Sequence, residues 1–155
     1  MVNANHLRNY VVKVALDHIG LYSKAAENLI MGTGAQESHL SYLKQIKGPA
    51  VGLFQMEPAT YKDIWDNYLA HKPELADLLR SLAGVKPGQI PHVNMMMGNL
   101  YYAAAMCRVY YLRKPEPLPD ADDVDGMAAY WKKYYNTHLG KGTEEEFVRN
   151  YKKTK

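Results

Sequence analysis

Apolar residues recur at helical spacing along most of the chain, which predicts a mainly helical protein. The first predicted helix ends near Gly20, and Ser23 is a suitable N-cap for a second helix that runs toward Glu37. The apolar residues of the first helix are Leu7, Val11, Val14, Ala15 and Ile19.

Two prolines and a segment rich in Met and Tyr predict the later helices. Pro58 and Pro73 suit the first turns of helices that would run to about residues 70 and 83. Residues 92–113 form the longest predicted helix, and its Met, Tyr and Ala content predicts that it is central and buried. Two further helices are expected near residues 122–136 and 143–151.

The helical pattern is interrupted at residues 41–52, SYLKQIKGPAVG, which contain two glycines and a proline. This composition predicts a loop that can close as a short hairpin. Residues 85–91 and 114–123 are expected to be surface connections. No repeat divides the chain, so the sequence predicts one mainly α domain over residues 1–155.

Glu37 lies where a surface carboxylate is not expected. Ala26, Ile30 and Gly34 share one face of the second helix, and Glu37 continues that face three residues later. Either the helix has ended at Glu37, or its carboxyl group is held against apolar surroundings. In the second case the pKa of the carboxyl group would rise, and it would keep a proton near neutral pH.

Positive charge is concentrated at the C-terminal end. Residues 131–155 contain seven Lys and Arg and three Glu, a balance of 7 − 3 = +4 in a chain whose net charge is +3. Such an end suits an anionic polymer such as cell wall, nucleic acid or lipid headgroups. A solvated helix with lysines on its free face is the simpler explanation for each single charge.

The single cysteine, Cys107, excludes an internal disulfide and is predicted to be a small core residue. The first ten residues, MVNANHLRNY, lack the apolar stretch of a secretory signal, and no segment reaches membrane-spanning length. We therefore expect synthesis in a cytoplasm without membrane insertion. The histidines lack metal-ligand spacing, and the acidic run at residues 120–125 lacks an EF-hand pattern, so no metal is expected.

A sequence pattern begins at Glu37-Ser38 and continues after the variable loop with GLFQMEPAT at residues 52–60. This segment has the form Gly-Leu-x-Gln-x-x-Pro-Ala-Thr. Further along, VNMMMGNLYY contains the spacing Asn-x-x-x-Gly-x-x-Tyr, and Tyr135-Asn136 lies within YWKKYYNTHLG. In order and spacing, from about residue 25 to 140, these segments resemble the catalytic core of the lysozyme-like lytic transglycosylases, which cut peptidoglycan.

The resemblance implies a lysozyme-like fold with a small loop or hairpin region beside the catalytic cleft, and no cofactor. Glu37 would be the catalytic acid and later the base, and Ser38 would support it. Gln55, with the backbone of Leu53 and Phe54, would line the sugar-binding groove.

The two later segments would complete the site. Tyr135 would lie over the Glu37 carboxyl group, where it could donate a hydrogen bond and limit water access. Asn136 would hold the substrate or the turn. The matching residues of the third segment would be architectural, in a helix packed behind the site: Asn94, Gly98 and Tyr101.

The chemistry of glycoside cleavage accounts for a buried acid, because a proton must reach the leaving oxygen. Two-carboxylate hydrolysis also needs a base or nucleophile, yet no Asp or Glu lies between Glu37 and Gly52. In a lytic transglycosylase this is expected, because one Glu serves as acid and then deprotonates the C6 hydroxyl of the sugar. Gly32 and Gly34 would permit close approach of substrate, or equally a tight helix crossing.

The sequence departs from the family pattern at Glu57, at Tyr134 and at the pair Thr137-His138. Glu57 stands where the family has an apolar residue, and it is either a solvent-facing acid at a helix N-terminus or a second carboxylate at the groove. The second case would make the protein a hydrolytic muramidase. Tyr134 replaces Ala, and Thr137 with His138 replaces a simple Gly turn.

The leading interpretation is a monomeric peptidoglycan-cleaving lytic transglycosylase that acts on the MurNAc-β-1,4-GlcNAc bond. Its small size resembles a phage endolysin or a virion-associated lysin, which would act on the cell wall after release or as part of the virion. The alternatives are the muramidase and a non-catalytic glycan-binding module. A nucleic-acid binder ranks last, because the charge is modest and is not interleaved with stacking aromatic residues.

Overall fold

The N-terminal segment forms one continuous helix, as the apolar spacing predicts. The computed structural model describes residues 1–136 and 140–155, and in it α1 (Ala4–His6), the π-helical η1 (Leu7–Val12) and α2 (Lys13–His18) follow one another without a break. The Asn3 side chain accepts a hydrogen bond from the His6 backbone N–H (3.0 Å) and caps the start. The chain turns at Gly20, whose φ of 71° suits a residue without a side chain.

The second predicted helix, α3 (Lys24–Ser38), is also confirmed. The Ser23 hydroxyl caps it by accepting from the Ala26 N–H (3.0 Å), and His39 ends it in the left-handed region at φ 53°. All residues from 26 to 35 are buried, so α3 is a core helix surrounded by other elements and not a surface helix with one apolar stripe.

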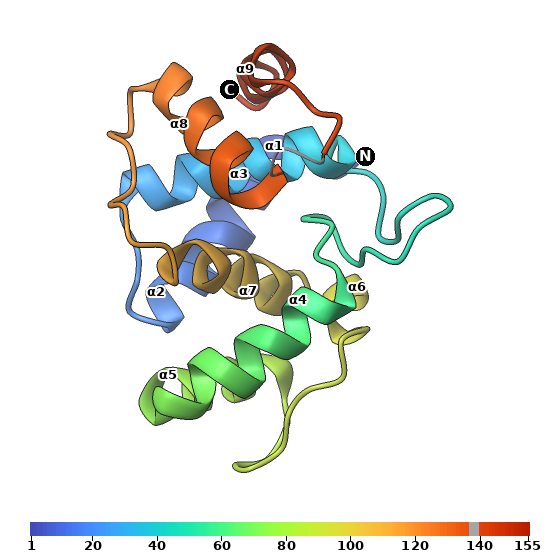
Figure 1. The fold of residues 1–155 in the computed structure, drawn as a ribbon, viewed down its shortest axis with the longest axis vertical. Coiled ribbons are helices and arrows are strands. Elements are labelled where there is room, and N and C mark those ends of the chain that lie inside the picture. Colours follow the sequence, from blue (N-terminus) through green and yellow to red (C-terminus); the bar gives the residue numbers. More distant parts are fainter. Residues whose placement is uncertain (137–139) are drawn as a thin grey trace.

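The loop after α3 forms a hairpin only in part. Two isolated antiparallel bridges, Lys44 with Val51 and Val51 with Met56, draw its ends together. Figure 1 shows the intervening segment projecting from the helical body. Gly52, at φ 81°, lies directly against the backbone of Met96. A Cβ at this position would lie 2.7 Å from the Met96 backbone oxygen, so a larger residue would not fit.

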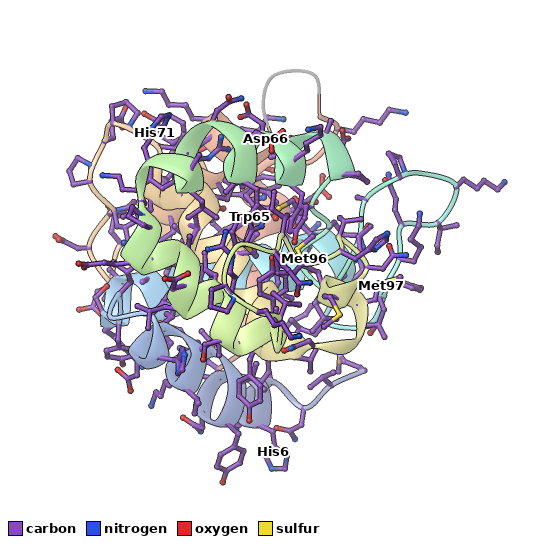
Figure 2. All side chains as sticks on the ribbon, turned by 90° about the horizontal axis from the view of Figure 1, so that it is seen from below. His6, Trp65, Asp66, His71, Met96 and Met97 are labelled. Carbon is purple, nitrogen blue, oxygen red and sulfur yellow. The ribbon has the colours of Figure 1, made fainter. Side chains whose placement is uncertain are left out.

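The prolines begin helices where the sequence predicts them. Pro58 opens α4 (Pro58–Asp63), which continues as η2 (Ile64–Tyr68) and η3 (Leu69–His71), and Pro73 opens α5 (Pro73–Ala83). These elements form the lower layer in Figure 1. Trp65 of η2 is buried and lies inside the molecule in Figure 2, so this layer closes over the core.

The prediction of one long helix over residues 92–113 is wrong. The segment divides into α6 (Met95–Gly98) and α7 (Leu100–Leu112) at Asn99, whose backbone is extended. The Asn99 side chain accepts from the Tyr102 N–H (3.0 Å) and donates to the Leu82 carbonyl (2.8 Å). Asparagine competes with the helical backbone in this way, and the apolar pattern alone does not reveal it. The central, buried position predicted for this segment holds for α7, which packs against α2, α3 and α5.

The C-terminal helices close the other side of the core. α8 (Val124–Trp131) continues as the π-helical η4 (Lys132–Asn136), and α9 (Glu144–Lys152) packs against α3 and α8. Asp123 and Thr143 cap α8 and α9. At the crossing of α9 and α3 (Figure 1), a Cβ on Gly32 would lie 2.4 Å from Cζ of Phe147. The glycine is therefore needed for close packing of the two helices.

The described residues thus form a single compact, mainly helical chain without a regular strand, as the sequence predicts. None of their helices is both long and apolar enough to cross a lipid bilayer.

Candidate active site

Glu37 lies in the last turn of α3, which continues through Ser38. The helix therefore has not ended before the carboxyl group, and the first explanation for its position is excluded. The side chain is half-buried, and its Oε2 accepts a hydrogen bond of 2.9 Å from the indole Nε1 of Trp131. Trp131 is fully buried at the end of α8, 94 residues further along the chain.

The surroundings of Glu37 favour its protonated form. Burial raises the pKa of the carboxyl group from 4.5 to about 7, because the charged form loses hydration. The hydrogen bond from Trp131 acts in the opposite direction, since it stabilises the carboxylate. The prediction of a carboxyl group held against apolar surroundings is confirmed, and such a group can hold and release a proton near neutral pH.

Trp131 is held in place by the C-terminal part of the chain. Its ring lies 5.4 Å, between centroids, from the ring of Phe147 in α9. A Cβ on Gly142 would lie 2.7 Å from the indole Cη2, so the chain before α9 lies directly on the indole. Contacts with Phe147 and Gly142 therefore help to orient the indole N–H toward Glu37.

A group of tyrosines, which we call the tyrosine cluster, packs together through its aromatic rings. Its members come from α7, α8 and η4: Tyr110, Tyr111, Tyr130, Tyr134 and Tyr135. The ring centroid of Tyr135 lies 4.5 Å from that of Tyr110 and 5.3 Å from that of Tyr111. Burial raises the pKa of these three hydroxyls, and the negative charge of Glu37 raises it further.

The hydrogen bond expected from Tyr135 to Glu37 is not made. The Tyr135 hydroxyl donates to the backbone oxygen of Phe54 (2.5 Å) and thereby joins η4 to the loop before α4. Trp131 supplies the donor to the carboxyl group instead. An indole N–H has no acceptor capacity, so it can only stabilise the charged carboxylate and cannot accept the acid proton.

The GLFQMEPAT segment contributes backbone, since the side chains of Leu53 and Phe54 are buried in the core. The Phe54 ring lies 3.1 Å from where a Cβ on Gly34 would be. Gly34 therefore makes room for this ring and for Leu40, and the suggestion that it admits substrate is wrong. Gln55 is half-buried at φ 51°, and its Nε2 donates to the Gly52 carbonyl (2.9 Å) within the same turn.

The remaining predicted site residues have local partners. The Ser38 hydroxyl donates to the Gly34 carbonyl (3.2 Å) of its own helix. Asn136 accepts from the ammonium of Lys132 (2.7 Å), which also donates to the carbonyls of Gly140 (3.0 Å) and Gly142 (2.7 Å). Glu57 is exposed at the N-cap of α4 without a capping hydrogen bond. The departures at Thr137 and His138 lie outside the described residues.

The third segment of the pattern does not pack as predicted. Asn94 and Gly98 are exposed, and Tyr101 is 43% exposed, whereas the neighbouring Met96 and Tyr102 are buried. The break at Asn99 changes the helical phase between α6 and α7, which is why a continuous helix gave the wrong buried face. These three residues are therefore not part of a helix interior behind the site.

Two further predictions concern metals and the cysteine. Figure 2 shows His6 and His71 at opposite edges of the molecule, and no three His, Cys, Asp or Glu side chains of residues 1–136 and 140–155 gather as a metal would require. Cys107 is fully buried, which confirms the core assignment, and burial raises the pKa of its thiol.

Trp131 is the residue that sequence reasoning missed. It precedes Tyr135 by four residues, so the two lie on one face of the α8–η4 helix. That spacing could have connected Trp131 to the site, but only the packing of α8 on α3 identifies Glu37 as its partner.

A scan against protein-family models, a search of curated proteins and a search of solved structures each gave no match for this chain. The similarity to lytic transglycosylases therefore rests on the sequence motifs described above.

Proposed function

We propose that this protein cleaves peptidoglycan glycan strands with Glu37 as its acid and base. The observation that carries the proposal is the half-buried Glu37 carboxyl group, whose pKa is raised to about 7. A surface glutamate with an ordinary pKa would be almost fully ionised at neutral pH and could not deliver a proton. The motif resemblance supplies the substrate class and a lysozyme-like arrangement of the helices.

The favoured reaction is that of a lytic transglycosylase. Glu37 gives its proton to the O4 atom of N-acetylglucosamine while the bond from C1 of N-acetylmuramic acid to that oxygen breaks. The acetamido group of the muramic residue shields the positive charge at C1. The ionised Glu37 then takes the proton of the C6 hydroxyl as its oxygen bonds to C1, which leaves a 1,6-anhydro-muramoyl end and consumes no water.

The causes of the raised pKa favour one carboxyl group over two. Burial and the Trp131 hydrogen bond account for the pKa of Glu37, with no contribution from another acid of the described residues. A second carboxylate at the separation that retaining glycosidases use, about 5–5.5 Å, would repel the charge of Glu37. Glu57, the candidate for that role, is exposed to solvent. A hydrolytic muramidase is therefore the second proposal.

A non-catalytic glycan-binding module is the third proposal. It would bind glycan at the same residues but would not need a proton donor, so the raised pKa of Glu37 disfavours it. In the setting that we propose, a phage endolysin or virion-associated lysin, cleavage of the wall is the required activity.

The test is mass spectrometry of the fragments that the protein releases from purified peptidoglycan. Wild type should give 1,6-anhydro-muramoyl ends, Glu37→Gln should give none, and Glu57→Gln should match wild type. Reducing muramic ends that disappear in Glu57→Gln would identify the muramidase. Wall binding by wild type and Glu37→Gln alike, with no fragments from either, would leave the binding module.

A further inference from the structure

Arg108, in the middle of α7, has no acidic partner among the described residues. None of the ion pairs of residues 1–136 and 140–155 includes it. Its Nε is buried without a hydrogen-bond partner. A guanidinium group carries five N–H donors in one plane, and a buried donor is normally paired. The Arg108 guanidinium is therefore a cationic donor group whose Nε has no acceptor among the described residues.

Arg108 lines a cavity of about 270 Å³ between α7, α8 and the connection that joins them. The cavity is smaller than the sites of drug-sized ligands, so it suits a small molecule or one end of a larger one. Its lining includes Arg108, Tyr111, Lys114, Pro117, Leu118 and Tyr130.

The charges at the cavity favour an anion. Lys114 adds a second positive charge, and its ammonium lies 5.1 Å from the ring centroid of Tyr110 with no carboxylate partner among the described residues. Glu116 also lines the cavity, but its carboxylate contacts Lys133. The Glu116 backbone oxygen accepts from the Tyr130 hydroxyl (2.9 Å), which fixes this wall.

We propose that this cavity binds a small organic anion whose carboxylate or phosphate group contacts the Arg108 guanidinium. Both groups accept two parallel N–H bonds from arginine. Leucine and proline side chains also line the cavity, so the remainder of the ligand is expected to be apolar. The cavity does not include Glu37, although Tyr111 and Tyr130 of the tyrosine cluster line it. Binding of an anion there would be a function distinct from the proposed cleavage of glycan strands.

The test is a titration of the full chain followed by the Nε–Hε resonance of Arg108 in ¹H–¹⁵N spectra. The probes are 4-methylpentanoate, phenyl phosphate and the neutral 4-methylpentanamide. We expect saturable shifts with at least one anion and none with the amide, and a preference of tenfold or more between the anions would identify the ligand as a carboxylate or a phosphate. No shift with either anion, or equal shifts with the amide, would overturn the proposal.

Variants provide the second readout. Arg108→Gln should weaken binding of the preferred anion at least tenfold. Arg108→Lys, which keeps the charge but loses the planar donor pair, should weaken it less. The matched control is Arg113→Lys, because Arg113 pairs with Asp63 and does not line the cavity. Unchanged affinity in folded Arg108→Gln would also overturn the proposal, and the wild-type titration decides the case if that variant does not fold.

Discussion

At the scale of single residues, the surroundings of Glu37 favour catalysis but lower the stability of the fold when its carboxyl group is ionised. A carboxyl group that keeps its proton near neutral pH must lie where its charged form is poorly solvated, and that environment destabilises the fold once the proton is lost. The raised pKa of Glu37 therefore predicts how both activity and stability change with pH.

Activity should fall as pH rises through about 7, the pKa of Glu37, because the fraction of enzyme that can donate a proton falls. Initial rates of peptidoglycan solubilisation between pH 5 and 9 would measure this. A rate that stays constant from pH 6 to 9 would contradict the assignment of Glu37 as the acid.

Glu37→Gln should be more stable than wild type at pH 8 and nearly equal to it at pH 4. Because the folded-state pKa is raised from 4.5 to about 7, the folded protein binds more protons between these values, and its stability falls as pH rises through them. At 1.36 kcal/mol per pKa unit, the free energy of unfolding of wild type falls by an amount that approaches about 3 kcal/mol above pH 7. Urea unfolding at both pH values, with the exposed Glu57→Gln as control, would measure the difference.

Trp131→Phe should move the fall in activity to higher pH. The substitution keeps an aromatic ring beside Phe147 but removes the N–H that stabilises the Glu37 carboxylate. We expect a shift of about one pH unit, the equivalent of one charge-assisted hydrogen bond. A merely structural role for Trp131 would lower the rate at every pH without this shift.

At the scale of elements, the site depends on how closely α9 packs on α3. Gly32→Ala should destabilise the protein by about 1–3 kcal/mol, because its Cβ would overlap the Phe147 ring that supports Trp131. Gly98→Ala is the control, since nothing lies within 4 Å of a Cβ there. Thermal unfolding of both variants would test this, and equal changes would show that helix propensity and not the crossing is responsible.

At the scale of the whole molecule, a second buried glutamate has the opposite pH behaviour. Glu27 is fully buried near the start of α3, where it joins the N-terminal helix to the core. Burial alone would raise its pKa, but hydrogen bonds from Lys24 (2.8 Å), Arg8 and Tyr22 (2.9 Å) outweigh burial and lower it. The folded state therefore favours the ionised form of Glu27, while it favours the protonated form of Glu37.

Glu27→Gln should lower the free energy of unfolding by about 3 kcal/mol at pH 7, because Arg8 and Lys24 lose their charged partner. The contribution of Glu27 is fully present above the unfolded-state pKa of 4.5 and is lost as pH falls through its lower folded-state value. The difference between variant and wild type should therefore shrink below about pH 4. Urea unfolding at pH 3.5 and 7 would measure it, and a difference that does not change with pH would contradict this account.

The sequence by itself determined most of the helices, because spacing, caps and prolines act within a few residues of the chain. Ser23, Pro58 and Pro73 begin helices where local rules predict them. The alignment of Glu37 with Ala26, Ile30 and Gly34 was also readable, and a raised pKa followed from one of the two explanations that it left open. The break at Asn99 was not readable, since it depends on a hydrogen bond to Leu82 in a neighbouring helix.

Only the tertiary structure decided which group faces Glu37. Tyr135 and Trp131 both lie on the α8–η4 helix, and the motif favoured the tyrosine, but the packing of α8 and α9 on α3 brings the indole N–H to the carboxyl group and directs the tyrosine hydroxyl to Phe54. The glycines of α3 are likewise explained by Phe147 and Phe54, which are distant in sequence. Hydrogen-bond partners and close contacts depend on distances between elements, and a helical repeat along one chain segment does not contain those distances.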